Sequence, residues 1–321
     1  MKSLRIAFLG TPEFAAVCLD RLLASDHTVV GVVTAPDRPA GRGHKLKPSA
    51  VKERALAAQL PLLQPVKLRD PEFLAAWDEW QPDIAVVVAF RMMPEVLWNR
   101  PPMGTINLHA SVLPQLRGAA PIQWAILHGL NETGVSTFAL QHEIDTGDVL
   151  GVSRVSIDHD MDSGRLHDLL LDAGKELLIN TLNGFGSQEI QPIPQESLLP
   201  QDIPLLNAPK LHKDNTRVPW DASALQVHNH VRGLHPFPTA WTSLPGSDSP
   251  LKILKGTDET GQSSIAEPGA IRISEKLELF VACGDGREFE IRELKPPGKR
   301  AMAASDWLRG LKPEERPERF Y

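Results

Sequence analysis

The sequence is poor in features that point to membrane or secreted proteins. It has two cysteines in 321 residues, Cys18 and Cys283, too few and too far apart for a disulfide framework or a cysteine zinc site. No apolar run is long enough to cross a membrane, and the run before Gly10, of about six residues, is too short for the core of a signal peptide. We therefore expect a cytoplasmic protein with no membrane contact.

The chain also lacks an excess of positive charge. Its net charge is −6, which argues against a protein coated with basic residues for nucleic-acid binding. The acidic excess lies before residue 206, whereas the remainder is close to neutral. Within the acidic part, cations gather in one segment: Arg38, Arg42, Lys45, Lys47, Lys52 and Arg54.

The length exceeds what one hydrophobic core usually organises, so two domains are expected. The segment 189–206 has four prolines and little pattern, which is typical of a linker. We therefore expect a first domain over 1–188 and a second over 207–321. The 42% hydrophobic content is ample for both cores.

The first domain reads as α/β. Apolar stretches at 4–10, 28–34 and 84–90 predict buried strands, and they alternate with expected helices at 11–25, from 50 onward and at 71–80. This alternation predicts a doubly wound, mostly parallel, Rossmann-like sheet covered on both faces. The segment 35–49, with its prolines and glycines, is expected to be a loop without regular structure.

The remaining pattern completes both domains. A strand at 104–110, two sheet-edge strands at 133–140 and 149–157, and a long helix at 161–185 close the first domain. A helix at 220–234 and short strands at 251–256, 269–273, 276–283 and 288–295 follow the linker. Small β-rich modules of this kind are often barrels.

One group of polar residues stands out at a strand end. The strand at 104–110 delivers Asn107 and His109, on one side, to the sheet edge where ligands of open α/β folds gather. An asparagine amide and an imidazole can hold a carbonyl oxygen that becomes negative during attack. Asp145, in a turn after another strand, could orient His109 and favour its charged form, or accept a proton from an attacking amine.

Each of these motifs alone is common by chance, and it is their coincidence that favours acyl transfer without a covalent intermediate. A dinucleotide-binding oxidoreductase is the first competing interpretation, because the first strand ends in glycine. The stretch GTPEFA lacks the required glycine spacing, and Pro12 and Glu13 would crowd and repel a pyrophosphate. PAGRGHK is likewise no phosphate-binding loop.

The stretches INLHASVLPQLRGAAPIQWAILHG and IDTGDVL resemble the formyltransferase family that uses 10-formyltetrahydrofolate. FLGTPEFA, PDRPAGRGHKLKPS and GDGREFEIRELKPPGKRAM are similar to the branch that formylates methionine on initiator tRNA. The resemblance implies a formyltransferase fold with a C-terminal OB-like barrel, and an enzyme of translation initiation. It further implies a monomer that needs no metal.

The resemblance also implies roles for individual residues. Asn107, His109 and Asp145 would be catalytic. The folate would lie against Ser111, Val112, Leu113 and Pro114, with Phe90, Arg91 and Met92 lining its pocket. Contacts with tRNA would come from Arg38, Arg42, Lys45, Lys47, Lys299 and Arg300. Val112 replaces the family's usual leucine and Arg91 its usual glycine, so Arg91 bears on the shape of the folate pocket.

Two alternatives stay open at this point. Related folate-dependent enzymes that formylate sugar amines or glycinamide ribonucleotide would share the catalytic residues, but they resemble only the first domain. A non-catalytic tRNA-binding protein would leave those residues idle. The other histidines considered, His44, His142 and His235, have no comparable partners in sequence and are expected to be surface or packing residues.

Overall fold

The computed structural model describes residues 2–40, 45–199, 204–246 and 249–321. The chain folds into two compact units that are each built from several segments. The first unit contains the residues up to 118 together with 133–155 and 168–207. The second contains 119–132, 156–167 and 208–321. The expected boundaries at 188 and 206 stay a prediction.

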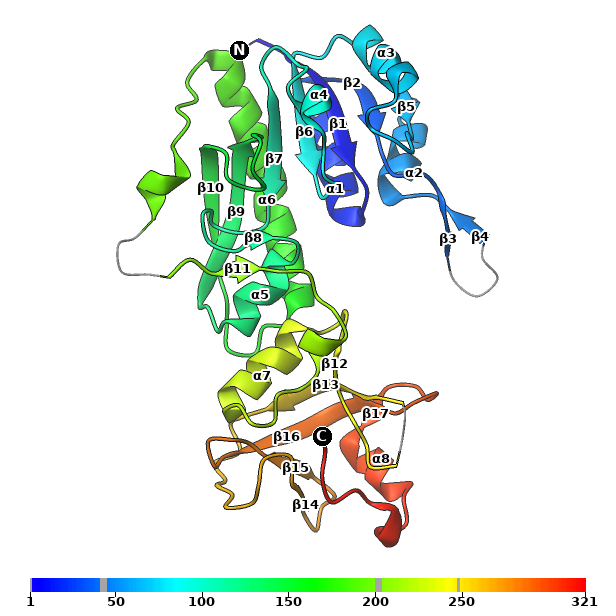
Figure 1. Ribbon diagram of the computed structural model, residues 1–321, viewed down its shortest axis with the longest axis vertical. Coiled ribbons are helices and arrows are strands. Elements are labelled where there is room, and N and C mark those ends of the chain that lie inside the picture. Colours follow the sequence, from blue (N-terminus) through cyan, green and yellow to red (C-terminus); the bar gives the residue numbers. More distant parts are fainter. Residues whose placement is uncertain (1, 41–44, 200–203, 247–248) are drawn as a thin grey trace. The chain divides into compact units, whose positions relative to one another are not determined.

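The first unit contains the predicted Rossmann-like sheet (Figure 1). Its order is β10-β9-β7-β6-β1-β2-β5, and β5, β2, β1, β6 and β7 run parallel. β9 is antiparallel to β7, so the two edge strands extend the sheet as expected. The strand bounds are β1 (Arg5–Gly10), β2 (Thr28–Val33), β5 (Leu62–Leu63), β6 (Ile84–Val88), β7 (Thr105–His109), β9 (Glu132–Ala139) and β10 (Val149–Ser156).

Helices pack on this sheet because each presents an apolar side to it. Ala7 and Leu9 of β1 form a core with Phe73 and Trp77, whereas α1 packs near β1, β2 and β6. Alternate residues of a strand face opposite sides, so both faces of β1 are buried. The helices are α1 (Glu13–Leu23), α2 (Ala50–Ala57), α3 (Pro71–Glu79), α4 (Glu95–Trp98) and α6 (Ser163–Ser187), with a 3-10 turn η1 (Gln195–Leu198).

The segment predicted as an irregular loop, 35–49, in fact contains two short paired strands of three residues each. β3 (Arg38–Ala40) and β4 (Lys45–Lys47) pair antiparallel and form a two-stranded sheet of their own, which extends away from β2 in Figure 1. Proline has no backbone N–H to donate to a neighbouring strand. Pro39 fits in β3 because this strand pairs on one side only, so its other edge needs no donor. The prediction was wrong because a short hairpin that covers no core shows no alternation of apolar and polar residues.

The base of this hairpin is held by side-chain bonds. Asp37 Oδ2 accepts from Lys52 Nζ at 2.6 Å, and Asp37 Oδ1 accepts from Gln64 Nε2 at 2.9 Å. The bond from Lys52, followed by that from Gln64, holds the pKa of Asp37 below its usual value. Ser49, the N-cap of α2, is 2.7 Å from the Thr34 hydroxyl. The hairpin therefore has a fixed attachment to the sheet.

The second unit is the small antiparallel β domain that the sequence predicts. Its sheet has the order β12-β13-β16-β15-β14, with β17 beside β16. Its core includes Trp220, Val227, Phe289 and Phe320. The elements are α5 (Pro121–Leu127), α7 (Ala224–Gly233), α8 (Ala304–Arg309), β12 (Ala240–Thr242), β13 (Leu251–Thr257), β14 (Ile271–Ile273), β15 (Leu279–Ala282), β16 (Glu288–Lys295), β17 (Met302–Ala303), η2 (Asp214–Thr216) and η3 (Pro313–Glu315). Two further short strands are β8 (Arg117–Gly118) and β11 (Asn207–Ala208).

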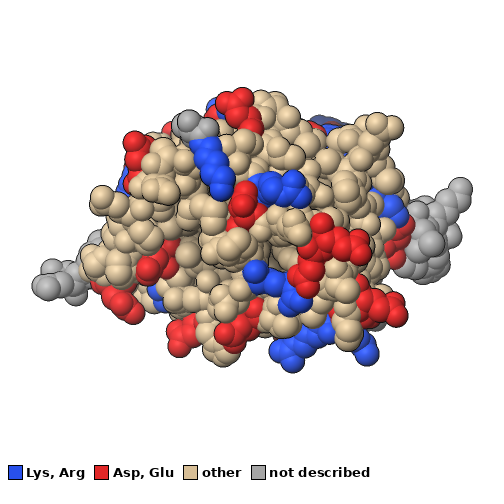
Figure 2. All heavy atoms as spheres, turned by 90° about the horizontal axis from the view of Figure 1, so that it is seen from above, with Lys and Arg blue, Asp and Glu red and all other residues tan. Residues whose placement is uncertain are grey.

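The surface carries charges of both signs. On the face shown in Figure 2, the described Lys and Arg side chains are interspersed with Asp and Glu. In the ranges that the structure describes, no helix combines the length and the apolar character that a bilayer crossing requires.

Candidate active site

Two candidate catalytic residues lie where β7 ends. β7 pairs parallel with β6 and antiparallel with β9, so its carboxyl end lies at the edge that carries the ends of the other parallel strands. Asn107 and His109 are its third and fifth residues, and strand alternation places them on the same side. The sheet thus brings both side chains to the edge where ligands of this fold class bind.

His109 is held in place by its surroundings. It is 7% exposed, and its ring meets that of Phe138 edge-on at 6.4 Å between centroids. Its Nε2 lies 2.9 Å from the carbonyl oxygen of Leu116. Because a carbonyl can only accept, Nε2 carries the proton of this bond. Nδ1 is therefore the nitrogen available to a reacting group.

Asp145 lies on the Nδ1 side of His109. It occupies the turn between β9 and β10 with a φ of +55°, a left-handed conformation that aspartate tolerates better than most residues. Its Oδ2 accepts from the backbone N–H of Gly118 at 3.1 Å and lies 3.9 Å from His109 Nδ1. The structure therefore brings Asp145 beside His109, at a separation longer than a direct hydrogen bond.

Asn107 has an unsatisfied side chain. Its Oδ1 is buried and has no hydrogen-bond partner in the described part of the chain. Buried polar atoms are nearly always paired in folded proteins, and exceptions concentrate at functional positions. The oxygen of the Asn107 amide is therefore available to a ligand at the end of β7.

Sequence reasoning missed one residue of this site, Gln195. Its Nε2 donates to the carbonyl oxygens of Asp145 at 3.0 Å and Gly147 at 2.7 Å. Its Oε1 accepts from Arg117 Nε at 3.0 Å and from an Arg117 terminal nitrogen at 2.7 Å. Gln195 is 2% exposed although it lies in the segment predicted as a linker. A glutamine followed by a short polar stretch among prolines gave no signal for this role.

The expected folate-binding loop is held by one internal bond and by bonds to Ser136 of β9. The Ser111 hydroxyl donates to the carbonyl oxygen of Gln115 at 2.6 Å, and the Ser111 carbonyl accepts from the Ser136 hydroxyl at 2.7 Å. Leu113 and Pro114 are buried, and Val112 is half-buried. The Ser111 and Leu113 side chains thus fix the shape of the loop that follows β7.

Phe90, Arg91 and Met92 follow β6. The Arg91 guanidinium donates to the carbonyl oxygens of Pro65 at 2.5 Å and Val66 at 2.8 Å and lies over the Phe90 ring at 5.7 Å. Arg91 and Met92 line a pocket of about 640 Å³ together with Lys67, Leu68, Arg69, Met93, Pro94, Glu95, Trp98 and His142. The catalytic candidates Asn107, His109 and Asp145 are not among these lining residues.

The basic residues expected to contact tRNA fall into three groups. Lys47 is exposed in β4, and Lys299 and Arg300 are exposed in the turn between β16 and β17. Arg42 lies outside the described residues, and of Arg38 and Lys45 only the backbone is described. Two neighbours of the cluster are engaged elsewhere: Lys52 pairs with Asp37, and Arg54 pairs with Glu13 and Asp20.

The three remaining histidines differ from one another. His142 is 87% exposed, as a surface residue should be, with Glu95 at 3.6 Å. His235 has a partner that the sequence did not suggest, because its Nδ1 lies 2.9 Å from Asp162 Oδ2. His44 lies outside the described residues.

Comparison with known proteins agrees with this geometry. Residues 4–182 match the family model described as formyl transferase, and residues 210–312 match the formyl transferase C-terminal domain. The chain is 43% identical over 312 residues to the methionyl-tRNA formyltransferase of Bacteroides fragilis, covering 97% of this chain and 96% of the relative. It is 44% identical over 314 residues to that of Porphyromonas gingivalis, covering 97% and 96%.

Solved structures show the same fold at low sequence identity. An N-formyltransferase from Helicobacter canadensis superposes with a TM-score of 0.65 at 17% identity, covering 90% of this chain and 98% of that one. HypX from Aquifex aeolicus, in complex with tetrahydrofolic acid, superposes with a TM-score of 0.62 at 16% identity, covering 96% of this chain and 47% of the longer HypX chain. With both domain models matched and relatives above 40% identity along nearly the whole length, the chain belongs to the formyltransferase family, in its methionyl-tRNA formyltransferase branch.

Proposed function

We propose that this protein transfers the formyl group of 10-formyltetrahydrofolate to the free amino group of methionine on initiator tRNA. The observation that carries the proposal is that Asp145 lies beside His109 at the end of β7, on the strand that also carries Asn107, whose buried Oδ1 has no partner among the described residues. Relatives that are similar over the whole length bear the name of this activity. The tetrahydrofolic acid of the HypX structure supports a folate as the co-substrate.

The proposed reaction needs an oxyanion to be stabilised and a proton to be moved. The methionine amine attacks the formyl carbon, a new C–N bond forms, and the bond from that carbon to the folate nitrogen breaks. Asn107 donates to the formyl oxygen from its amide. His109, protonated on both nitrogens, donates from Nδ1 to the same oxygen while Nε2 stays bound to Leu116.

Asp145 has two parts in this scheme. Its Oδ2, 3.9 Å from His109 Nδ1, is the counter-charge for the ring. It also receives the proton that the amine loses, and this proton passes on to the leaving folate nitrogen. The bond from Gly118 N–H keeps Oδ2 in place for both tasks.

The folate is proposed to lie against residues 111–114 and Phe90, Arg91 and Met92. Because Arg91 bonds to the Pro65 and Val66 carbonyls, its side chain is turned onto the strand-end segment and packs against Phe90. This arrangement supports a pocket wall in which Arg91 contributes its flat guanidinium. Val112 presents a smaller side chain than the usual leucine, so the wall is slightly wider there.

The tRNA is proposed to contact two basic sites, the segment with Arg38, Arg42, Lys45 and Lys47, and the turn with Lys299 and Arg300. Of these residues, Lys47, Lys299 and Arg300 are exposed in the described part of the chain. Cations of this kind bind phosphates and make affinity depend on salt. We further propose a cytoplasmic monomer, which sedimentation of the purified protein tests.

The test is transfer of a radiolabelled formyl group from 10-formyltetrahydrofolate, with three acceptors in parallel. Charged initiator tRNA should be formylated much faster than charged elongator tRNA. A nucleotide-linked amino sugar serves as the third acceptor, since sugar N-formyltransferases share the fold. Transfer to the amino sugar alone would replace the proposal with that activity, and no transfer to any acceptor would reject it.

A further inference from the structure

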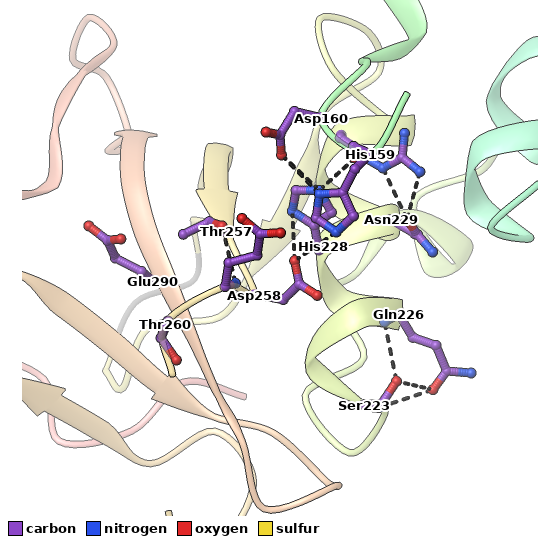
Figure 3. Close-up of polar contacts among 12 residues, drawn as sticks. His159, Asp160, Ser223, Gln226, His228, Asn229, Thr257, Asp258, Thr260 and Glu290 are labelled. Carbon is purple, nitrogen blue, oxygen red and sulfur yellow. Dashed lines mark hydrogen bonds and ion pairs between the residues drawn. The ribbon is translucent and has the colours of Figure 1, made fainter. Parts of the chain in front are cut away.

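Three metal-binding side chains converge in the second unit, at residues that the proposed reaction does not use. His159 follows β10, His228 lies in α7, and Asp258 comes directly after β13 (Figure 3). One ligand atom from each lies within 4.8 Å of the others. His159 Nε2 is 3.5 Å and His228 Nδ1 is 3.7 Å from the same atom, Asp258 Oδ1.

The outer nitrogen of each histidine faces a hydrogen-bond acceptor. His228 Nε2 is 3.0 Å from the carbonyl oxygen of His159, and His159 Nδ1 is 3.3 Å from Asp160 Oδ1. Both outer nitrogens therefore carry a proton. In a neutral ring the inner nitrogen is then a lone-pair acceptor that points toward Asp258. Histidine ligands of metals typically have this second bond to a carbonyl or a carboxylate.

The interior of the cluster has no donor to match these acceptors. Asp258 Oδ1 is buried and lacks a hydrogen-bond partner among the described residues. The His228 side chain is 3% exposed. When both rings are neutral, two imidazole lone pairs and a carboxylate oxygen face one another at a distance where they repel. A cation between them would convert this repulsion into attraction.

We propose that His159, His228 and Asp258 bind one zinc ion. Zinc prefers imidazole and carboxylate ligands at about 2.0–2.2 Å in a tetrahedral arrangement, which sets neighbouring ligand atoms about 3.3 Å apart. The separations of 3.5 and 3.7 Å from Asp258 Oδ1 need only a small contraction, and the two ring nitrogens lie within 4.8 Å of each other. The two rings are stacked within 16°, so the His159 ring turns to direct its lone pair at the ion. The His159 side chain is 43% exposed, and Asp160, which its Nδ1 contacts, is 78% exposed and can move with the ring.

The site has room for a fourth ligand, and zinc bound there would link separate segments of the second unit. His228 and Asp160 also line a cavity of about 560 Å³, which can supply a water molecule to the open coordination position. The three ligands come from residues 156–167, from α7 and from the end of β13, so zinc would tie together three distant segments of the unit. Structural zinc sites are usually recognised in a sequence by closely spaced ligands, which these three residues are not.

The test measures zinc binding by the full-length protein after dialysis against a chelator. Plasma mass spectrometry gives the stoichiometry, competition with a chromophoric chelator gives the affinity, and thermal unfolding is followed with and without zinc. The variants are His159→Ala and Asp258→Asn. His142→Ala is the matched control, because this exposed histidine also lies near a carboxylate.

The expected result is one zinc per chain for the unsubstituted protein and for His142→Ala, with a higher unfolding temperature when zinc is present. In His159→Ala and Asp258→Asn, affinity should fall by at least about tenfold, and the zinc-dependent rise in unfolding temperature should disappear. Absence of zinc binding, or equal affinity in all four proteins, would overturn the proposal.

Discussion

Gln195 Nε2 donates to the carbonyl oxygen of Asp145 at 3.0 Å, while Gln195 Oε1 accepts two bonds from the Arg117 side chain. The buried amide of Gln195 therefore holds both the turn that carries Asp145 and the side chain of Arg117, the residue before Gly118. Since Gly118 N–H bonds to Asp145 Oδ2, Gln195 fixes the position of this carboxylate from both sides.

Replacement of Gln195 should slow formyl transfer without removing any proposed catalytic group. Misplacement of Asp145 by a fraction of an ångström should lower turnover roughly tenfold to a hundredfold. In Gln195→Glu, two carbonyls would face a carboxylate, so this variant should be at least as slow as Gln195→Ala. Steady-state kinetics check this, with Gln262→Ala, an exposed glutamine of the second unit, as the control. Turnover equal to that of the control would show that Asp145 needs no support.

The two proposed donors to the formyl oxygen should each be essential for rate. Loss of one such donor typically removes about 2.7–4 kcal/mol of transition-state stabilisation. Asn107→Ala and His109→Ala should each lower turnover by two or more orders of magnitude, while circular dichroism stays that of a folded protein. Near-normal turnover in either variant would remove that residue from the mechanism.

The charge of Asp145 can be separated from its shape. Asp145→Asn keeps the side-chain size and the turn, but it removes the counter-charge 3.9 Å from His109 and the proposed proton acceptor. We expect a slower enzyme with a changed pH profile of turnover. A profile and a rate that match the unsubstituted protein would make Asp145 a turn residue only.

The hairpin cations should matter for tRNA and not for folate. Arg42→Ala and Lys47→Ala should weaken the binding of charged tRNA. The slope of log affinity against log salt concentration should become shallower by about one unit for each phosphate that the variant no longer neutralises. Lys299→Ala with Arg300→Ala should act in the same direction. Lys276→Ala, an exposed lysine between β14 and β15, is the control. Folate affinity, measured by fluorescence, should be unchanged; an unaltered salt series on tRNA would reject the proposed tRNA-binding residues.

The two cysteines should be chemically silent in the folded protein. Burial raises the pKa of both Cys18 and Cys283 to about 12. At pH 8 the thiols therefore stay protonated, and the thiolate is the reactive form. A colorimetric disulfide reagent should find no fast thiol in the native protein and two after unfolding in guanidinium. Rapid reaction of either cysteine at pH 8 in the native state would contradict this.

Much of the first unit follows from local pattern. The buried strands, the parallel order and the placement of Asn107 and His109 were predicted because uniformly apolar strands alternate with helices, and strand ends share an edge. The hydrogen bonds of Gln195 were not predicted, because bonds across a sequence separation of fifty residues leave no periodic trace. The cluster of His159, His228 and Asp258 was not predicted for the same reason, because its three residues are far apart in the sequence.

The two compact units are interleaved along the chain. Residues 119–132 and 156–167 belong to the second unit although they precede the segment 189–206. A truncation at 206 would strip these segments of their partners. Removal of the charges at Lys299 and Arg300 is therefore a cleaner test of the second unit than its deletion.

The membership of α5 in the second unit has a consequence for synthesis on the ribosome. Ala125 and Ile126 of α5 are fully buried, and the backbone of Gly233 at the end of α7 lies against Ile126. α7 is translated about one hundred residues after α5, which at about 5–20 residues per second leaves an interval of about 5–20 s. During that interval the first unit emerges while α5 still waits for its partner. A nascent chain halted before residue 224 should therefore bind chaperones through this helix, and one released after residue 321 should not.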